Sequence, residues 1–147
     1  MAKTISSEPL IKEVIVKAPV EKVWKAITDR DEMAKWYFDL AEFKPVVGFE
    51  FQFEGGKDGG KCYLHLCKIT EVIVNKKITY SWRYDGYAGI SFVTFELFVE
   101  GDETRIKLTH EGLDTFPSDN KDLARENFDY GWTSIIQGSL KKYFEKN

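Results

Sequence analysis

The last third of the sequence restricts the possible folds most. Residues 90–100 and 103–111 alternate apolar and polar side chains on either side of Gly101-Asp102, which is the pattern of a β-hairpin with a two-residue turn. A predicted helix of about twenty-five residues follows, with a broad apolar side that includes Trp132. One long helix packed on a strongly curved antiparallel sheet encloses a space, so the sequence predicts a fold with an internal cavity.

The hairpin turn also sets a register. It places Glu100 opposite Glu103 and extends into a ladder with one apolar and one charged face. The apolar face pairs Leu97 with Ile106, Phe95 with Leu108 and Val93 with His110, and the other face pairs Glu96 with Lys107 and Phe98 with Arg105. Because opposite charges meet outside while apolar residues meet inside, the two faces support the same register.

A second hairpin is predicted around Asn75-Lys76. Counting outward from this turn pairs Ile78 with Ile73, Tyr80 with Glu71, Trp82 with Ile69 and Tyr84 with Cys67, and it puts His65 on their face. Leu64 and Leu66 then fall on the opposite face, and a β-bulge would reconcile their preference for burial with this register.

The remaining elements follow from periodicity. A strand over Leu10–Lys17 ends at Ala18-Pro19, where a helix with an apolar stripe begins. A second short helix is expected over Asp31–Lys35, further strands over residues 49–54, 61–74 and 77–84, and a hairpin loop over Gly55–Gly60. The sequence therefore predicts an α+β fold, a curved six-stranded antiparallel β-sheet around a long C-terminal helix with two short helices between the first two strands, in a single domain over residues 1–147.

The C-terminal helix is expected to start near Ser118, a good N-cap residue after a proline. Gly131, Ser134 and Gly138 form a stripe of small residues beside its large apolar ones. Each glycine costs about 0.8–1 kcal/mol relative to alanine in a helix interior, so a compensating role is expected. Either the helix approaches the sheet closely at this stripe, or the stripe leaves space for a ligand.

Charge and composition exclude several functions. The chain has 147 residues and a net charge of -3, with lysines scattered among acids, so neither a nucleic-acid partner nor a membrane surface is expected. No apolar run is long enough for a signal peptide or a membrane span, and a cytoplasmic location is expected. Cys62 and Cys67 point to opposite faces of one predicted strand, so a disulfide between them is not expected.

The predicted concave face offers a binding site for a small apolar or amphipathic ligand. Such sites are mostly apolar with a few convergent polar groups. The candidate ligand-binding residues are Phe51, Phe53, His65, Tyr80, Trp82, Tyr84, Phe95, His110, Trp132 and Ile135. We expect Trp82, Phe95 and Trp132 to contact the ligand and His110 or Tyr80 to orient its polar end. The alternative is that these aromatic side chains simply fill the core, since aromatic residues make up 15% of the chain.

Acid–base catalysis by His65 or His110 with Glu71 is a second hypothesis, because histidine titrates near neutral pH. No nucleophile motif and no metal-ligand spacing occur in the sequence. We therefore expect no catalytic residue, no metal and no cofactor. A third hypothesis is that the protein acts through its surface, with Trp36-Tyr37-Phe38 as an exposed anchor for a protein partner. The alternative is that Trp36 plugs one end of the sheet.

Five segments in this order resemble the START-like helix-grip superfamily (SRPBCC), and within it the stand-alone domains related to the activator of the heat-shock-protein-ninety ATPase. These segments are Ala18–Asp29, Met33–Trp36, Tyr80–Trp82, Leu108–Gly112 and Gly131-Trp132. The resemblance, from about Ile11 to Glu145, implies a six-stranded sheet that grips the C-terminal helix. It also implies binding of lipids, sterols, polyketides or similar molecules, a cyclase, dehydratase or hydrolase-type activity in some members, and docking on a chaperone in others.

Overall fold

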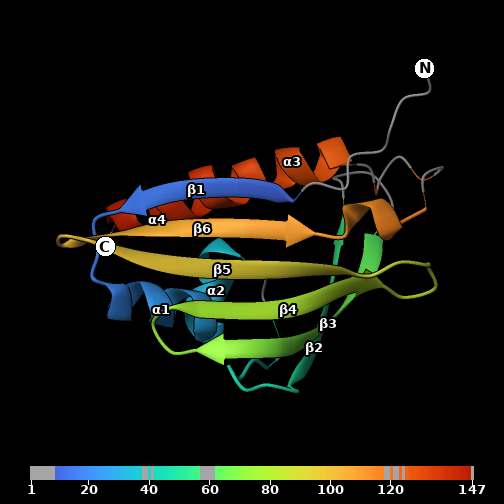
Figure 1. Ribbon diagram of the computed structural model, residues 1–147, viewed down its shortest axis with the longest axis horizontal. Coiled ribbons are helices and arrows are strands. Elements are labelled where there is room, and N and C mark those ends of the chain that lie inside the picture. The colour runs from blue at the N-terminus through green and yellow to red at the C-terminus, as the bar shows by residue number, and fades with distance from the viewer. Residues whose placement is uncertain are drawn as a thin grey trace.

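The structure is a computed structural model that describes residues 9–37, 40, 42–56, 62–117, 120, 123 and 125–146. Its elements follow the chain as β1 (Leu10–Val16), α1 (Val20–Thr28), α2 (Arg30–Trp36), β2 (Glu50–Gly56), β3 (Cys62–Ile73), β4 (Lys77–Tyr84), β5 (Ser91–Glu100), β6 (Glu103–Glu111), the short 3-10 turn η1 (Leu113–Thr115), α3 (Arg125–Ser134), η3 (Ile135–Leu140) and α4 (Lys141–Lys146). The six strands form one antiparallel sheet in the order β1-β6-β5-β4-β3-β2 (Figure 1). The predicted α+β helix-grip fold is confirmed.

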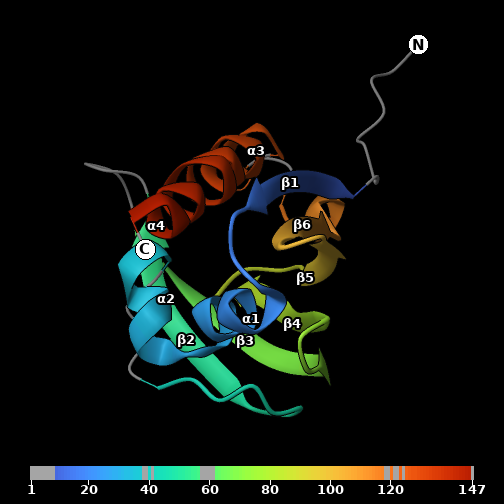
Figure 2. The same ribbon diagram turned by 90° about the vertical axis from the view of Figure 1, so that its left-hand side faces the viewer.

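The sheet curves around the helices. Figure 2 shows α1 and α2 at one end of the curved sheet, with α3 and α4 along its open side. The segments α3, η3 and α4 are consecutive pieces of one C-terminal helix, in which η3 has π-helical hydrogen bonding. The predicted start of this helix at Ser118 lies outside the described residues.

The two short helices have local causes in the sequence. Pro19 is the N-cap of α1, one position before the first helical residue, and Val23, Trp24 and Ile27 form its buried stripe. The N-cap of α2 is Asp29, whose carboxylate accepts a hydrogen bond from the backbone N–H of Glu32. The helix α2 therefore begins at Arg30, slightly earlier than predicted.

The β5–β6 register is confirmed at every predicted pair, including Val93 opposite His110 and Glu96 opposite Lys107. On the outer face, a row of alternating charges crosses β1, β6, β5 and β4. Glu13 lies opposite Lys107, and Glu96 lies between Lys107 and Lys77. The hairpin and its neighbours thus have one charged and one apolar face, as their alternation predicts.

The β3–β4 register was predicted wrongly. Ile69 lies opposite Tyr80, not Trp82, and the register shifts between Ile69 and Glu71 because Thr70 is a bulge. The turn contains three residues, and its Asn75 adopts φ 65°, so counting from a two-residue turn misaligned the strands. The bulge that the outward-facing leucines indicated is present.

The C-terminal helix covers the free edge of β1. Lys12 forms an ion pair with Asp129 (2.5 Å), and the side chains of Arg125 and Gln137 donate to the backbone carbonyl oxygens of Pro9 (3.3 Å) and Glu13 (3.2 Å). An edge strand presents unpaired backbone groups, and these contacts satisfy some of them. The helix is thereby held along one side of the sheet.

The stripe of small residues does not approach the sheet closely. A Cβ atom added at Gly131 or Gly138 would find nothing within 4 Å, and Ser134 is exposed. Of the two alternatives that the sequence left open, close helix–sheet contact at this stripe is therefore excluded. The other alternative, space for a ligand beside the stripe, stays a prediction.

Candidate ligand-binding site

The concave side of the sheet brings the ten predicted site residues into one core. Nine of them are buried, on β2, β3, β4, β5, β6 and α3, while Ile135 at the start of η3 is partly buried against the core. The rings pack in contact. The ring centroid of Trp132 lies 5.7 Å from that of Trp82 and 6.2 Å from that of Phe95. The helix and the middle of the sheet therefore meet through aromatic side chains.

His110 links the helix to the sheet through both ring nitrogens. The indole N–H of Trp132 donates to His110 Nδ1 (2.9 Å), so Nδ1 carries no proton. The proton is therefore on Nε2, which donates to Ser91 Oγ (2.7 Å), and the Ser91 hydroxyl donates to the carbonyl oxygen of Trp82 (3.0 Å). Each donor in this series of hydrogen bonds has an acceptor when the imidazole of His110 is neutral.

Burial keeps both histidines neutral. It lowers the pKa of His110 from its ordinary value of 6.5 to about 3, because the charged imidazolium would lose its hydration. Burial likewise lowers the pKa of His65 to about 4. His65 Nδ1 lies 2.9 Å from the carbonyl oxygen of Tyr63, which can only accept, so His65 is protonated at Nδ1. Its ring stacks on Phe53, with centroids 4.5 Å apart.

Two tyrosine hydroxyls meet inside the core. The hydroxyl oxygens of Tyr37 and Tyr80 are 2.6 Å apart, and burial raises the pKa of both phenols well above the ordinary value of 10. The Tyr84 hydroxyl accepts a hydrogen bond from the Trp82 indole N–H (2.8 Å). The tyrosines, like the histidines, are uncharged hydrogen-bonding groups.

Tyr37 is a partly buried residue that packs against the core, and the sequence suggested it only as part of a surface anchor. Its ring stacks on Trp36 with centroids 4.9 Å apart and on Trp132 at 6.1 Å. Trp36 is buried, and its indole N–H donates to the carbonyl oxygen of Ala26 (2.9 Å). The prediction that Trp36 plugs one end of the sheet is confirmed, whereas Phe38 lies outside the described residues.

Ser91 is the other group that sequence reasoning missed. Strand alternation could have found it, because Ser91, Val93 and Phe95 share one face of β5. No periodic signal identified Tyr37, which follows the last residue of α2.

The described aspartate, glutamate, lysine and arginine side chains lie outside this core. None of the described aspartate, glutamate, lysine and arginine residues is buried. Glu71, predicted to share the histidine face, is instead exposed and pairs with Lys77 at 3.2 Å, because the Thr70 bulge changes its register. Within the described ranges, no group of three or more histidine, cysteine, aspartate and glutamate side chains could hold a metal ion.

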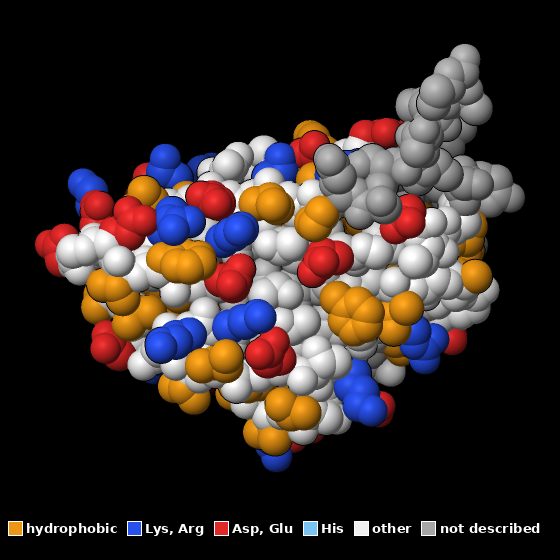
Figure 3. Space-filling model, in the orientation of Figure 1, with side chains coloured by type: hydrophobic (Ala, Val, Ile, Leu, Met, Phe, Trp, Pro, Cys, Tyr) orange, Lys and Arg blue, Asp and Glu red, His pale blue; other side chains and the backbone are white. Residues whose placement is uncertain are grey.

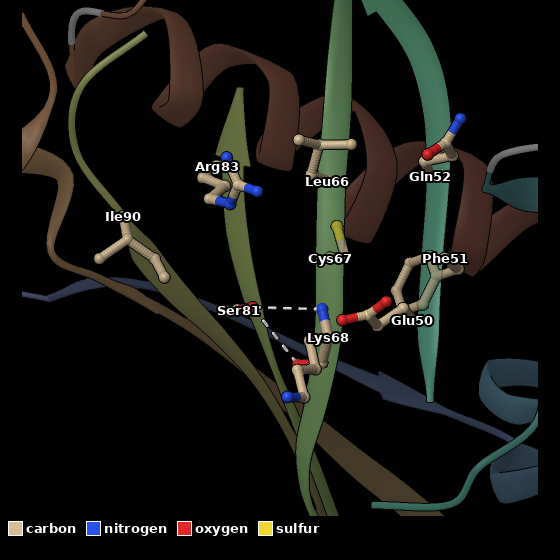
Figure 4. A pocket seen from close by; sticks show the side chains of 9 residues that line it. All are labelled: Glu50, Phe51, Gln52, Leu66, Cys67, Lys68, Ser81, Arg83 and Ile90. Carbon is tan, nitrogen blue, oxygen red and sulfur yellow. Dashed lines mark hydrogen bonds between the residues drawn. The ribbon is translucent and has the colours of Figure 1, made fainter. Parts of the chain in front are cut away.

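A separate hollow of about 460 Å³ lies on the outer face of β2, β3 and β4 (Figure 4). Ser81 is its buried polar group, and it hydrogen-bonds the backbone N–H and carbonyl of Lys68 (3.1 and 3.4 Å). The side chains of Glu50, Lys68 and Arg83 around it are exposed. This hollow lies on the opposite side of the sheet from the aromatic core.

Among the described residues, no helix has the length and apolar character needed to cross a membrane. Figure 3 shows acidic, basic and hydrophobic side chains intermixed on one face of the molecule, without a large area of a single charge.

Comparison with known proteins gives a family and a fold. A family model described as "Activator of Hsp90 ATPase homolog 1-like protein" matches residues 17–145. A search of curated proteins gives no significant match. Solved structures that resemble this one include protein BH1534 from Bacillus halodurans (26% identity, TM-score 0.71, 93% of this chain and 96% of that chain) and Mll3558 from Rhizobium loti (19%, 0.79, 92% and 96%).

A third similar structure is DynU16, described as a protein of the dynemicin biosynthetic locus, with 21% identity and a TM-score of 0.73. The match covers 93% of this chain but 47% of DynU16, so the chain spans about half the length of that relative. At these identities, the likenesses to DynU16 and Mll3558 concern the fold alone.

Proposed function

Because the chain belongs to the family of Activator of Hsp90 ATPase homolog 1-like proteins, we propose that it binds a small apolar or amphipathic molecule between the sheet and the C-terminal helix, without catalysing a reaction. The observation that carries this proposal is the composition of the concave side, where aromatic rings surround a few uncharged polar groups. Small-molecule sites have this composition. The cytoplasmic location expected from the sequence is part of the proposal.

The proposed contacts are the ten residues predicted from the sequence, with roles adjusted to their hydrogen bonds. Trp82, Phe95 and Trp132 provide ring surfaces. A hydroxyl can donate one hydrogen bond and accept two, so Tyr80 can accept a further bond from the polar end of a ligand. His110 already uses both ring nitrogens, and in this proposal it holds the indole of Trp132 in position.

The histidine environment favours binding over acid–base chemistry. A general acid or base is most effective when its pKa lies near the working pH. The pKa values of about 4 for His65 and about 3 for His110 lie well below neutrality, and His110 hydrogen-bonds a serine and a tryptophan. These features support a role for both side chains as part of the lining of the binding site, and not as acid–base groups.

Native mass spectrometry of the full chain, purified from its own host, tests the proposal. We expect a stoichiometric adduct that denaturing extraction releases as an apolar or amphipathic molecule. Ile135→Trp, which adds bulk beside the core, should abolish the adduct, whereas Ser139→Trp on an exposed position of the same π-helical segment should keep it. A clean protein mass, with no uptake of added hydrophobic probes, would contradict the proposal.

A second candidate function is docking on a protein partner, which the family's description as activator-like supports. Exposed apolar side chains provide possible contacts, since Val46 and Val47 before β2 are 58% and 60% exposed and Val74 in the β3–β4 turn is 66% exposed. Pull-down with a heat-shock-protein-ninety chaperone distinguishes the two functions, because Val46→Asp with Val47→Asp should abolish docking but leave small-molecule binding unchanged.

A further inference from the structure

A partly buried phenol ring from outside the sheet and the C-terminal helix packs against the core. Tyr37 follows α2, and its ring lies stacked near Trp132 (6.1 Å, interplanar angle 25°) and edge-on to Phe95 (6.3 Å, 79°). Its hydroxyl bonds that of Tyr80. Two of the three side chains proposed to provide ring surfaces for a ligand are therefore in contact with Tyr37.

The attachment of Tyr37 to α2 is local. Its backbone N–H donates to the carbonyl oxygen of Met33 (2.7 Å), the last such bond at the end of a seven-residue helix. Helix ends open more easily than helix centres, since few hydrogen bonds must break there. Withdrawal of the ring would disturb α2 and leave the sheet ladder intact.

Among the described residues, no charged side chain lies around the Tyr37 ring. The aromatic rings, the Tyr80 hydroxyl and the neutral His110–Trp132 pair line this part of the core, and no described aspartate, glutamate, lysine or arginine is buried. A charged group placed here would lose its hydration without gaining a counter-ion. A neutral hydroxyl or carbonyl group in the position of the Tyr37 hydroxyl could instead hydrogen-bond the Tyr80 hydroxyl.

Resting on the proposed function, we propose that the ligand is an uncharged planar aromatic molecule bearing a hydroxyl or carbonyl group, and that it replaces the Tyr37 ring against Trp132 and Phe95 and hydrogen-bonds Tyr80. Tyr37 then acts as an internal competitor that occupies the site when the ligand is absent. The same contacts select against carboxylates and amines.

Isothermal titration of the full chain at neutral pH with naphthalene, 2-naphthol and 2-naphthoate tests the ligand class. These probes share a ring system and differ in a hydrogen-bonding group or a charge. We expect 2-naphthol to bind about fivefold more tightly than naphthalene, the worth of one net hydrogen bond. We expect 2-naphthoate to bind roughly a hundredfold more weakly than 2-naphthol, because its carboxylate is desolvated without a partner.

Variants of the two tyrosines test the position. Affinity for 2-naphthol should increase from wild type to Tyr37→Phe to Tyr37→Ala, since the competing ring first loses its hydroxyl and then is removed. The Phe variant retains the ring and serves if the Ala variant does not fold. Tyr80→Phe should remove the advantage of 2-naphthol over naphthalene, while Tyr130→Ala, at a 77% exposed position on α3, should leave all affinities unchanged.

Each failure has a distinct meaning. If 2-naphthoate binds as tightly as 2-naphthol or more tightly, the proposal that the ligand is uncharged is wrong, but the proposed small-molecule binding still stands. Unchanged 2-naphthol affinity in both Tyr37 variants overturns the replacement of Tyr37. Absence of binding of all three probes to wild type and to both Tyr37 variants overturns the inference, and together with a clean native mass it overturns the proposed function as well.

Discussion

Acidification to pH 5 should destabilise this protein through its two buried histidines. A histidine in the unfolded chain has an ordinary pKa of 6.5, whereas burial lowers the pKa to about 3 for His110 and about 4 for His65. The unfolded state therefore binds more protons than the folded state below pH 6.5. The stability that the neutral histidines contribute is present above that pH and is lost as the pH falls towards the folded pKa values.

The magnitude follows from the pKa difference. Each pH unit between the two pKa values corresponds to about 1.4 kcal/mol per histidine, and pH 5 lies about 1.5 units below the unfolded value. Each histidine should therefore reduce the free energy of unfolding by about 2 kcal/mol between pH 7 and pH 5, and the pair by about 4 kcal/mol. The lowered pKa values of Glu32 and Asp129 act mainly at lower pH, since their ordinary values are 4.5 and 3.8.

Urea unfolding followed by tryptophan fluorescence at pH 7 and pH 5 measures this loss. His65→Gln and His110→Gln should each remove about half of the pH dependence, whatever their effect on stability at pH 7. A loss below about 1 kcal/mol in the wild type, or imidazole resonances of the folded protein that titrate near pH 6.5, would refute the reasoning.

Three further predictions concern single contacts. Long-range proton–nitrogen NMR spectra should show opposite neutral tautomers, Nδ1–H for His65 and Nε2–H for His110, and the same tautomer in both would contradict the assigned hydrogen bonds. Gly112→Ala should lower the free energy of unfolding, measured by chemical denaturation, by about 1–2 kcal/mol more than Gly101→Ala does. Both glycines have positive φ, but only at Gly112 would the new Cβ lie 2.9 Å from the Ile90 carbonyl oxygen, so equal effects would argue against that close contact. Glu96→Lys should destabilise the sheet by up to about 1 kcal/mol at low salt and less at high salt, because it places like charges beside Lys77 and Lys107; a salt-independent effect would exclude this electrostatic cause.

The two hairpins show where sequence reasoning succeeds and where it fails. The β5–β6 ladder was predictable because a two-residue turn and the alternation of charged and apolar residues fix the same register. The β3–β4 ladder was not, because the Thr70 bulge and the three-residue turn shift the pairing without a distinct signal in the composition. The error moved Glu71 from the outer surface to the histidine face, and it suggested a carboxylate partner that none of the described residues supplies in the core.

The candidate site shows the same division. Period-two alternation placed His65, Tyr80 and Phe95 on the concave face, and it could have added Ser91. Tyr37 could not be found in this way, because its ring reaches the core from the end of α2 rather than from a strand of the sheet.

The sequence by itself determined the order of the elements, the apolar faces of the strands and of the C-terminal helix, and the family, because periodicity and short motifs act over neighbouring residues. Only the tertiary structure decided which polar atoms pair in the core. The bonds from Trp132 to His110 and from Tyr37 to Tyr80 join residues 22 and 43 positions apart, and their geometry depends on how the whole sheet curves around the helices. Burial then fixes the charge of these groups, since a desolvated imidazole or phenol is stable only in its neutral form.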